Sequence, residues 1–305
     1  MEINTVSIIG LGALGTLFGH HLSGHMPPDS LRIVADAGRI AKYQKEEVFC
    51  NGEPCRFHYV KPEEACTPAD LLIFCVKYQG LAGAIEEAGN QVGPNTVILS
   101  LLNGISSEEI IGRTFGMDKL LYSVAQGMDA VKVGNQLAYR NMGLICFGGR
   151  QPGELSESAK AVARFFGRTH LPYELSTDMP HKLWGKLMFN VGVNQTVAVF
   201  ETDYGGIQKE GPARETMISA MKEVMRLSEQ ENVNLSQSDL DYWFTVLDKL
   251  NPLGKPSMRQ DLEAKRKSEV DLFAGTVLAL GRKHGLSFPT NQMLYDRIKE
   301  IESRF

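Results

Sequence analysis

The sequence predicts an α/β fold of the Rossmann type, a doubly wound parallel sheet, followed by a second, all-helical domain. Three observations lead to this prediction. A glycine-rich segment follows a short strand at residues 3–9, two strongly apolar runs occupy 71–76 and 97–101, and helical periodicity dominates the C-terminal part. The chain has 305 residues, which is too long for one small domain and suits two. We therefore expect the sheet-bearing domain at 1–176 and the helical domain at 177–305.

The first half alternates apolar runs with helical patterns, which is typical of an open parallel sheet. The run at 71–76 is apolar throughout and is bounded by charged residues, as in a strand buried on both faces. Asn51-Gly52 stands between 48–50 and 56–60 and predicts a hairpin or tight turn. The remaining expected elements are strands at 31–35 and 171–175 and helices at 16–23, 39–45 and 154–167.

The second half offers few strand candidates after residue 179 and reads as helical. Ser236 begins a Ser-x-x-Asp segment, a common helix start. We expect five helices, at 179–194, 213–232, 236–249, 258–285 and 291–305.

Composition excludes several classes of function. The formal net charge is -4, and the short basic run 265–267 is flanked by glutamates, as on a solvated helix face, so nucleic acid is not an expected partner. No apolar run reaches the length of a membrane span, and no targeting segment is visible. The five cysteines are odd in number without a Cys-x-x-Cys pair, and the histidines form no metal signature. We expect a cytoplasmic protein with reduced thiols and no metal.

Gly10-x-Gly12-x-x-Gly15 lies between the first strand and the first helix, which is the context that gives this pattern meaning. Gly10 would allow the tight turn, Gly12 the close approach of a pyrophosphate, and Gly15 the packing of helix on strand. The helix N-terminus would then face the phosphates with its unpaired N–H groups. The expected cofactor contacts in this loop are Gly10, Leu11, Gly12, Ala13, Leu14 and Gly15.

The adenosine end of such a cofactor leaves two alternatives open. Asp36 ends the second strand, and an acidic residue there commonly binds a ribose 2′-hydroxyl, which favours NAD. Arg39 follows three residues later and could instead pair with the 2′-phosphate of NADP.

Lys186, Asn190 and Asn194 are spaced at i, i+4 and i+8 in an otherwise apolar helical segment, so they share one helix face. An ammonium and two amides amid apolar residues are costly unless they line a polar site. A cation near a ketone oxygen stabilises the developing alkoxide and can supply its proton. The alternative is a solvated helix face.

Five segments stand in order along nearly the whole chain. They are the glycine segment 10–15, Val76-Lys77, Leu102-Asn103-Gly104, the stretch KLWGKLMFN at 182–190 continuing to Asn194, and Ser257 followed by Glu269. Together they resemble the ketopantoate reductase family. The resemblance implies a Rossmann domain and a helical domain with the site in the cleft between them. It also implies reduction of the ketone of 2-dehydropantoate by NADPH, giving pantoate for coenzyme A biosynthesis.

The resemblance also implies roles for the residues of the helical half. Lys186 would be the proton donor. Asn190, Asn194 and Ser257 would bind the hydroxyl and carboxylate of the substrate. Glu269 would help to place the nicotinamide ribose and the substrate. Taken alone, Ser257 could equally be an N-cap and Glu269 an exposed helical carboxylate.

In the first half, the resemblance implies that Asn103 contacts cofactor and substrate and that Lys77 lies near the cofactor. Two departures keep alternatives open. Asp36 stands where many members carry a basic residue, so NAD remains possible beside NADP. Tyr204 stands where some members offer a further asparagine, so a different 2-keto acid is an alternative substrate. A non-catalytic NAD(P)-sensing protein is a weaker alternative, and a homodimer is compatible with the sequence.

Overall fold

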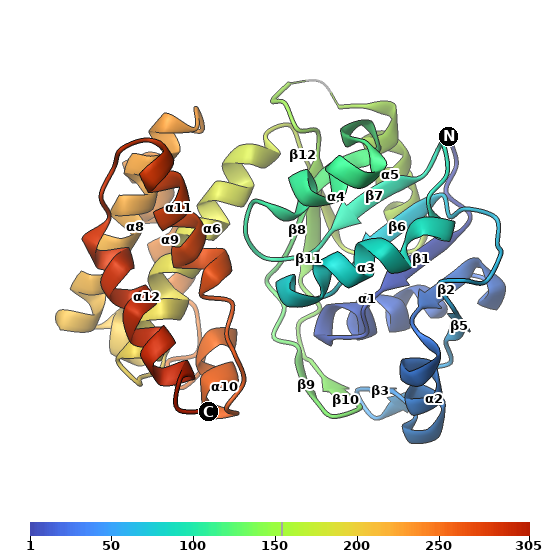
Figure 1. Cartoon of the computed structure of the whole chain (residues 1–305), viewed down its shortest axis with the longest axis horizontal. Coiled ribbons are helices and arrows are strands. Elements are labelled where there is room, and N and C mark those ends of the chain that lie inside the picture. The colour runs from blue at the N-terminus through green and yellow to red at the C-terminus, as the bar shows by residue number, and fades with distance from the viewer. Residues whose placement is uncertain (154) are drawn as a thin grey trace. The chain divides into compact units, whose positions relative to one another are not determined.

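The computed structural model describes residues 1–153 and 155–305, which form two compact units (Figure 1). The first unit, Met1–Pro180, is a sheet with helices on both faces, and the second, His181–Phe305, is helical. The predicted fold class is therefore confirmed. In the part of the chain that the structure describes, no helix is long and apolar enough to cross a membrane.

The main sheet of the first unit has the strand order β12-β11-β8-β7-β6-β1-β2-β5. Its central strands are parallel, and almost every residue in them is buried, which accounts for their predominantly apolar sequences. These strands are β1 (Val6–Ile9), β2 (Leu31–Val34), β6 (Leu71–Phe74) and β7 (Val97–Ser100).

One side of this sheet departs from the predicted parallel order. β8 (Leu120–Gln126) is parallel to β7, but β11 (Leu144–Gly148) returns antiparallel to β8. The intervening residues 127–143 contain a two-stranded excursion and no crossover helix, and a parallel return would have required a crossover. The last strand, β12 (Tyr173–Ser176), pairs parallel with β11.

Asn51 and Gly52 form a turn with positive φ angles of 50° and 82°, as the sequence predicted. The strand that returns from this turn is β4 (Glu53–Pro54), which pairs with β3 (Phe49–Cys50). The predicted hairpin partner at 56–60 is wrong, because β5 (His58–Val60) pairs with β2 and extends the main sheet instead.

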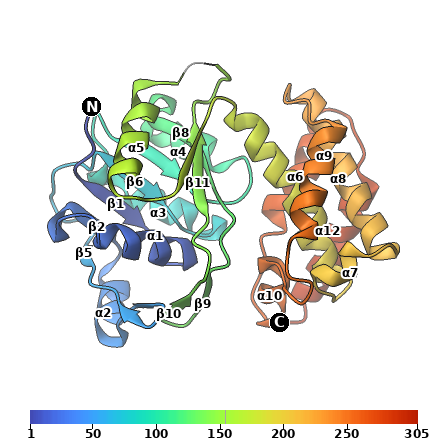
Figure 2. The same cartoon turned by 180° about the vertical axis from the view of Figure 1, so that it is seen from behind.

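A second, small sheet contains the two strands that lie between β8 and β11 in the sequence. β9 (Val131–Val133) and β10 (Gln136–Ala138) form a hairpin, and β10 pairs with β3. The order of this sheet is β4-β3-β10-β9. Residues 49–54 and 131–138, which are far apart in sequence, thus meet in one sheet near the chain's second helix (Figure 2).

Helices cover both faces of the main sheet, as a doubly wound fold requires. One apolar core joins Leu17 and Phe18 with Phe165, and a separate core joins Leu81 with Ile111. The predicted helix at 154–167 begins at 157, where Ser156 caps it, and Glu154 lies outside the described residues. The helices are α1 (Ala13–Ser23), α2 (Ala37–Glu46), α3 (Leu81–Glu87), α4 (Ser107–Phe115) and α5 (Glu157–Arg168).

The helical unit follows the predicted pattern with one addition and one break. Ser236 and Asp239 form the capping box that the sequence indicated. A short helix, α7 (Tyr204–Gln208), was not predicted. The helices are α6 (Met179–Val199), which begins at the end of the first unit, α8 (Pro212–Gln230), α9 (Gln237–Asp248), α10 (Ser257–Glu263), α11 (Thr276–Lys283) and α12 (Pro289–Glu302).

The single helix predicted at 258–285 is wrong. α10 ends at Glu263, Lys265 has a positive φ of 53°, and the helix resumes only with a π turn at Asp271–Gly275. The backbone N–H and hydroxyl of Ser268 both donate to the buried Glu302 carboxylate, at 2.7 and 2.6 Å. This long-range contact holds the chain out of the helix, so the basic run lies on an exposed loop.

Candidate active site

The glycine loop connects β1 to α1, and two of its glycines are required by packing within the chain. Gly10 has a φ of +96°, and a Cβ there would lie 2.7 Å from the Val76 side chain and 2.9 Å from the Cys75 carbonyl. A Cβ at Gly15 would lie 1.8 Å from the Gly10 oxygen. No side chain fits at either position without moving backbone.

Gly12 differs from its two neighbours. A Cβ there would meet only the Cys75 oxygen at 3.7 Å, which is ordinary contact. The residue is the N-cap of α1 and offers no side chain to the first-turn N–H groups. Packing within the chain therefore does not explain glycine here, whereas an anion lying close to the helix N-terminus would.

Asp36 and Arg39 interact with each other. The Asp36 carboxylate caps α2 by accepting from the Arg39 backbone N–H at 2.8 Å, and it pairs with the Arg39 guanidinium at 3.1 Å. The guanidinium also lies 3.3 Å from Glu87 of α3. Burial raises the pKa of Glu87, and Arg39 opposes the rise. Two carboxylates thus share one guanidinium, and a 2′-phosphate would compete with both for it.

Lys77 and Asn103 follow the carboxyl ends of β6 and β7, three residues beyond the last residue of each strand. The two strands are in register, with Phe74 opposite Ser100, and β1 ends opposite β6. Lys77, which is exposed, and Asn103, which is half-buried, therefore lie at the same sheet edge as the glycine loop. Ligands of open α/β sheets bind at this edge.

A buried polar network underlies the loop that carries Asn103. The hydroxyls of Ser100 and Ser107 lie 2.8 Å apart, and Ser107 donates to Glu108 at 2.9 Å. Ser123 donates to the Ser100 carbonyl at 2.8 Å. Burial raises the pKa of Glu108 to about 7. The network fixes both ends of the loop from Leu101 to Ser106, and no pattern in the sequence indicated it.

The helical unit carries the polar stripe on α6. Lys186 is half-buried, and Asn190 and Asn194 are each only 7 % exposed. Among the described residues, neither asparagine side chain has a hydrogen-bond partner. The amides of Asn190 and Asn194 are therefore available as donors and acceptors for a molecule other than this helix bundle.

An aromatic contact fixes the neighbouring face of α6. Phe189 stacks on Trp243 of α9 with ring centroids 4.7 Å apart. Gly185 lets the same indole approach, since a Cβ there would lie 3.1 Å from its ring nitrogen. The glycine next to Lys186 is thus explained by packing.

A buried amide network fixes another face of α6. Gln195 donates to the Val191 carbonyl at 2.7 Å and accepts from the Ala274 N–H at 3.1 Å. It also reaches Asn291 at 3.4 Å, and Asn291 donates to Glu223 at 2.7 Å. These contacts tie α6 to α8, α12 and the π turn, and they hold the stripe in one orientation.

Ser257 and Glu269 lie on either side of the break in the predicted helix. Ser257 is exposed and is the first residue of α10, whose N-cap is Pro256, so the alternative role of Ser257 as an N-cap is wrong. Glu269 is half-buried in a bend, and its carbonyl accepts from the Leu272 N–H at 2.9 Å. The alternative of an exposed helical carboxylate is therefore also wrong.

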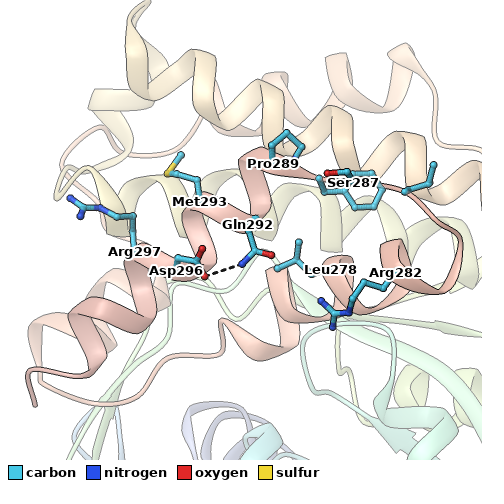
Figure 3. A pocket seen from close by; sticks show the side chains of 10 residues that line it. Leu278, Arg282, Ser287, Pro289, Gln292, Met293, Asp296 and Arg297 are labelled. Carbon is cyan, nitrogen blue, oxygen red and sulfur yellow. Dashed lines mark hydrogen bonds between the residues drawn. The ribbon is translucent and has the colours of Figure 1, made fainter.

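A surface groove on the helical unit, near α11 and α12, is separate from all of these residues (Figure 3). Gln292 donates to Asp296 at 2.9 Å within it. None of the site residues predicted from the sequence lines it. Its lining is Leu278, Arg282, Leu286, Ser287, Phe288, Pro289, Gln292, Met293, Asp296 and Arg297.

A Rossmann-type unit followed by a helical unit with a lysine–asparagine stripe defines a class of two-domain oxidoreductases. Residues 6–149 match the family model described as Ketopantoate reductase PanE/ApbA, and residues 178–302 match the model for its C-terminal part. The chain belongs to the ketopantoate reductase family.

Relatives of known sequence or structure span essentially the whole chain. A 2-dehydropantoate 2-reductase of Aquifex aeolicus is 26 % identical over 302 residues, covering 97 % of this chain and 96 % of the relative. The structure of D-mandelate dehydrogenase with NADH and anilino(oxo)acetate superposes with a TM-score of 0.87 at 21 % identity, covering 98 % and 99 % of the two chains. A dimeric ketopantoate reductase from Staphylococcus aureus gives 0.80 at 17 % identity with the same coverage. At these identities the two structures establish the fold alone.

Proposed function

We propose that this protein is a 2-dehydropantoate 2-reductase that transfers hydride from NADPH to the substrate ketone and releases pantoate. The observation that carries the proposal is the α6 stripe, where Lys186 accompanies two buried amides, Asn190 and Asn194, that have no partner among the described residues. A keto acid with a hydroxyl group offers matching donors and acceptors. Membership of the family supports the reaction type.

The first unit fits a dinucleotide. Gly10 and Gly15 bring the loop against β6, and Gly12 leaves the N-terminus of α1 open to a pyrophosphate. Lys77 and Asn103 would lie along the cofactor at the sheet edge. We propose that residues 1–176 hold the cofactor and that residues 177–305 supply the substrate-binding side chains. The cofactor, when bound, supplies the hydride.

Lys186 would supply the proton. As hydride reaches the carbonyl carbon, the carbonyl oxygen gains negative charge, which the ammonium stabilises before passing its proton to that oxygen. A proton from bulk solvent then restores the ammonium, so one proton is consumed for each hydride transferred. Asn190, Asn194 and Ser257 would hold the hydroxyl and carboxylate, and Glu269 would position the substrate and the ribose. These polar groups would discriminate against keto acids without the hydroxyl.

A second candidate is an NADH-dependent reductase of a different 2-keto acid. The net negative cluster of Asp36, Arg39 and Glu87 favours a ribose hydroxyl over a phosphate. D-mandelate dehydrogenase, a structural neighbour, was solved with NADH and an oxoacetate compound. We keep NADPH as the proposal because family precedent favours it, and a homodimer because a neighbour is dimeric.

Absorbance at the nicotinamide band tests both candidates, with NADPH and NADH run in parallel against 2-dehydropantoate, pyruvate, 2-oxobutyrate and phenylglyoxylate. We expect the lowest KM and the highest kcat/KM with NADPH and 2-dehydropantoate. A better rate with phenylglyoxylate and NADH would favour the second candidate. Oxidation of neither cofactor with any keto acid would contradict both.

A further inference from the structure

A lysine distant in sequence reaches the glycine loop. Lys132 lies on β9, and its ammonium donates to the carbonyl of Leu11, between the first two loop glycines, at 2.7 Å. The hairpin that carries it is anchored at β3 through β10, where Gln136 pairs with Phe49. The small sheet therefore places the ammonium of Lys132 beside the loop where the cofactor phosphates are proposed to bind.

The electrostatic setting of this ammonium is unusual for the chain. Lys132 is half-buried, and burial lowers its pKa, as does nearby Lys42, while the Cys55 thiol opposes the fall. No carboxylate forms an ion pair with Lys132 in the part of the chain that the structure describes. Arg39, at the same end of the unit, is held by two carboxylates.

A partly desolvated cation is costly unless an anion accompanies it. The neutral carbonyl of Leu11 satisfies one of the three ammonium N–H groups and leaves donors over. The N-terminus of α1, whose N-cap is Gly12, adds positive potential from the helix dipole. Both features favour a negatively charged ligand at this point.

We propose that Lys132 binds a phosphate of the dinucleotide and so adds a charged contact to the glycine loop. The proposal rests on the proposed function, because it takes the ligand to be NADPH or NADH. Two phosphates share this chemistry: the pyrophosphate, which both cofactors carry, and the 2′-phosphate, which only NADPH carries. Lys132 is a specificity determinant in the second case.

The test compares Lys132→Met, which keeps the length of the side chain, with Lys132→Arg, which keeps the charge. Lys61→Met, at an exposed lysine of the same unit, is the control. Calorimetric titration of the full-length protein gives Kd for NADPH, NADH, 2′,5′-ADP and ADP-ribose at low and high salt. A melting curve for each variant verifies that it is folded.

We expect Lys132→Met to weaken binding by about 10- to 100-fold, as for loss of one charge-assisted contact. The arginine variant should stay within a few fold of the parent, since guanidinium also binds phosphate. The affinity of the methionine variant should depend less on salt, because one charge contact is gone. Weaker binding of NADPH, NADH and ADP-ribose, which contain the pyrophosphate, assigns that group. Weaker binding of NADPH and 2′,5′-ADP alone assigns the 2′-phosphate.

Three results separate this inference from the proposed function. If the parent protein binds and oxidises NADPH while Lys132→Met retains its Kd within twofold, the inference is overturned and the function stands. An equal loss of affinity in Lys132→Met and Lys132→Arg, with an unchanged salt dependence, also overturns the inference, because Lys132 would then only stabilise the loop. If the parent binds neither dinucleotide, the proposed function itself fails.

Discussion

The glycine loop and the α6 stripe differ in what fixes their residues. At Gly10 and Gly15, backbone atoms of the same chain exclude any side chain. At Asn190 and Asn194, buried amides have no partner among the described residues, so the fold gives no reason for their identity. The loop glycines are therefore required by the fold, whereas the stripe is proposed to serve a ligand. Substitutions in the two regions should separate stability from activity.

The largest expected effect is on activity at the stripe. Lys186→Ala should lower kcat by about 10²–10⁴, the usual scale for loss of a positioned general acid. Lys186→Arg should rescue poorly, because guanidinium scarcely releases a proton. The melting temperature and the affinity for NADPH should stay close to those of the parent. Turnover is measured on variants saturated with NADPH.

Lys222→Ala, at an exposed lysine of α8, serves as the control and should keep full turnover. If folded, saturated Lys186→Ala reduced 2-dehydropantoate within a few fold of the parent, Lys186 would not be the acid. The stripe would then need another explanation.

Within the loop, Gly15→Ala and Gly12→Ala should behave differently. The Cβ that Gly15→Ala adds would overlap the Gly10 carbonyl, so the free energy of unfolding should fall by roughly 2–4 kcal/mol. At Gly12 the space is sufficient, and the cost should be below about 1 kcal/mol. Gly12→Ala should instead weaken NADPH binding about tenfold or more. Urea unfolding and calorimetric titration measure the two quantities, and equal unfolding costs would remove the distinction.

The features predicted from the sequence are local ones. The glycine loop, the buried central strands and the capping box at Ser236 depend on residues within one turn or strand. The missed features join distant segments. Lys132 reaches Leu11 across 121 residues, and Arg39 reaches Glu87 across 48. No periodicity in the sequence indicates such contacts, because they depend on strand order.

Contacts between distant segments also explain why the single helix predicted at 258–285 was wrong. The basic run at 265–267 continues a helical pattern in the sequence. In the structure Lys265 has a positive φ, and Ser268 contacts Glu302, 34 residues later, instead of continuing the helix. For the site, spacing alone placed Lys186, Asn190 and Asn194 on one face. Their burial and the network around Gln195 required the packed structure.

A pH-dependent effect is expected from the network beneath the Asn103 loop. Burial raises the pKa of Glu108 from 4.5 to about 7, so the folded state holds a proton that the unfolded state has lost between these pH values. The free energy of unfolding should therefore fall as pH rises from about 4.5 to 7 and stay lower above it. The Glu108 contribution should be at most about 3 kcal/mol.

Glu108→Gln removes the titrating group while keeping the shape of the side chain. At pH 8 it should be more stable than the parent, and the fall in stability across this pH range should become smaller. Denaturant unfolding at pH 5, 6, 7 and 8 measures both quantities. Glu109→Gln, on the adjacent residue of α4, is the control. An unchanged pH profile in Glu108→Gln would mean that Glu108 does not titrate in this range.

Two adjacent residues of α6, Asn194 and Gln195, should affect stability in opposite directions. Leucine has nearly the shape of asparagine, and the Asn194 amide has no partner among the described residues. Asn194→Leu puts an apolar side chain at this nearly buried position, so it should raise the free energy of unfolding slightly, by up to about 1 kcal/mol. Gln195→Leu should lower it by roughly 2–3 kcal/mol, since the contacts to Val191, Ala274 and Asn291 are lost and their groups stay buried. The KM for 2-dehydropantoate should rise about tenfold in Asn194→Leu, as for one lost hydrogen bond to substrate. Urea unfolding and steady-state kinetics on both variants give the comparison. A clear loss of stability in Asn194→Leu would mean that this amide serves the fold, and the division between loop and stripe would not hold.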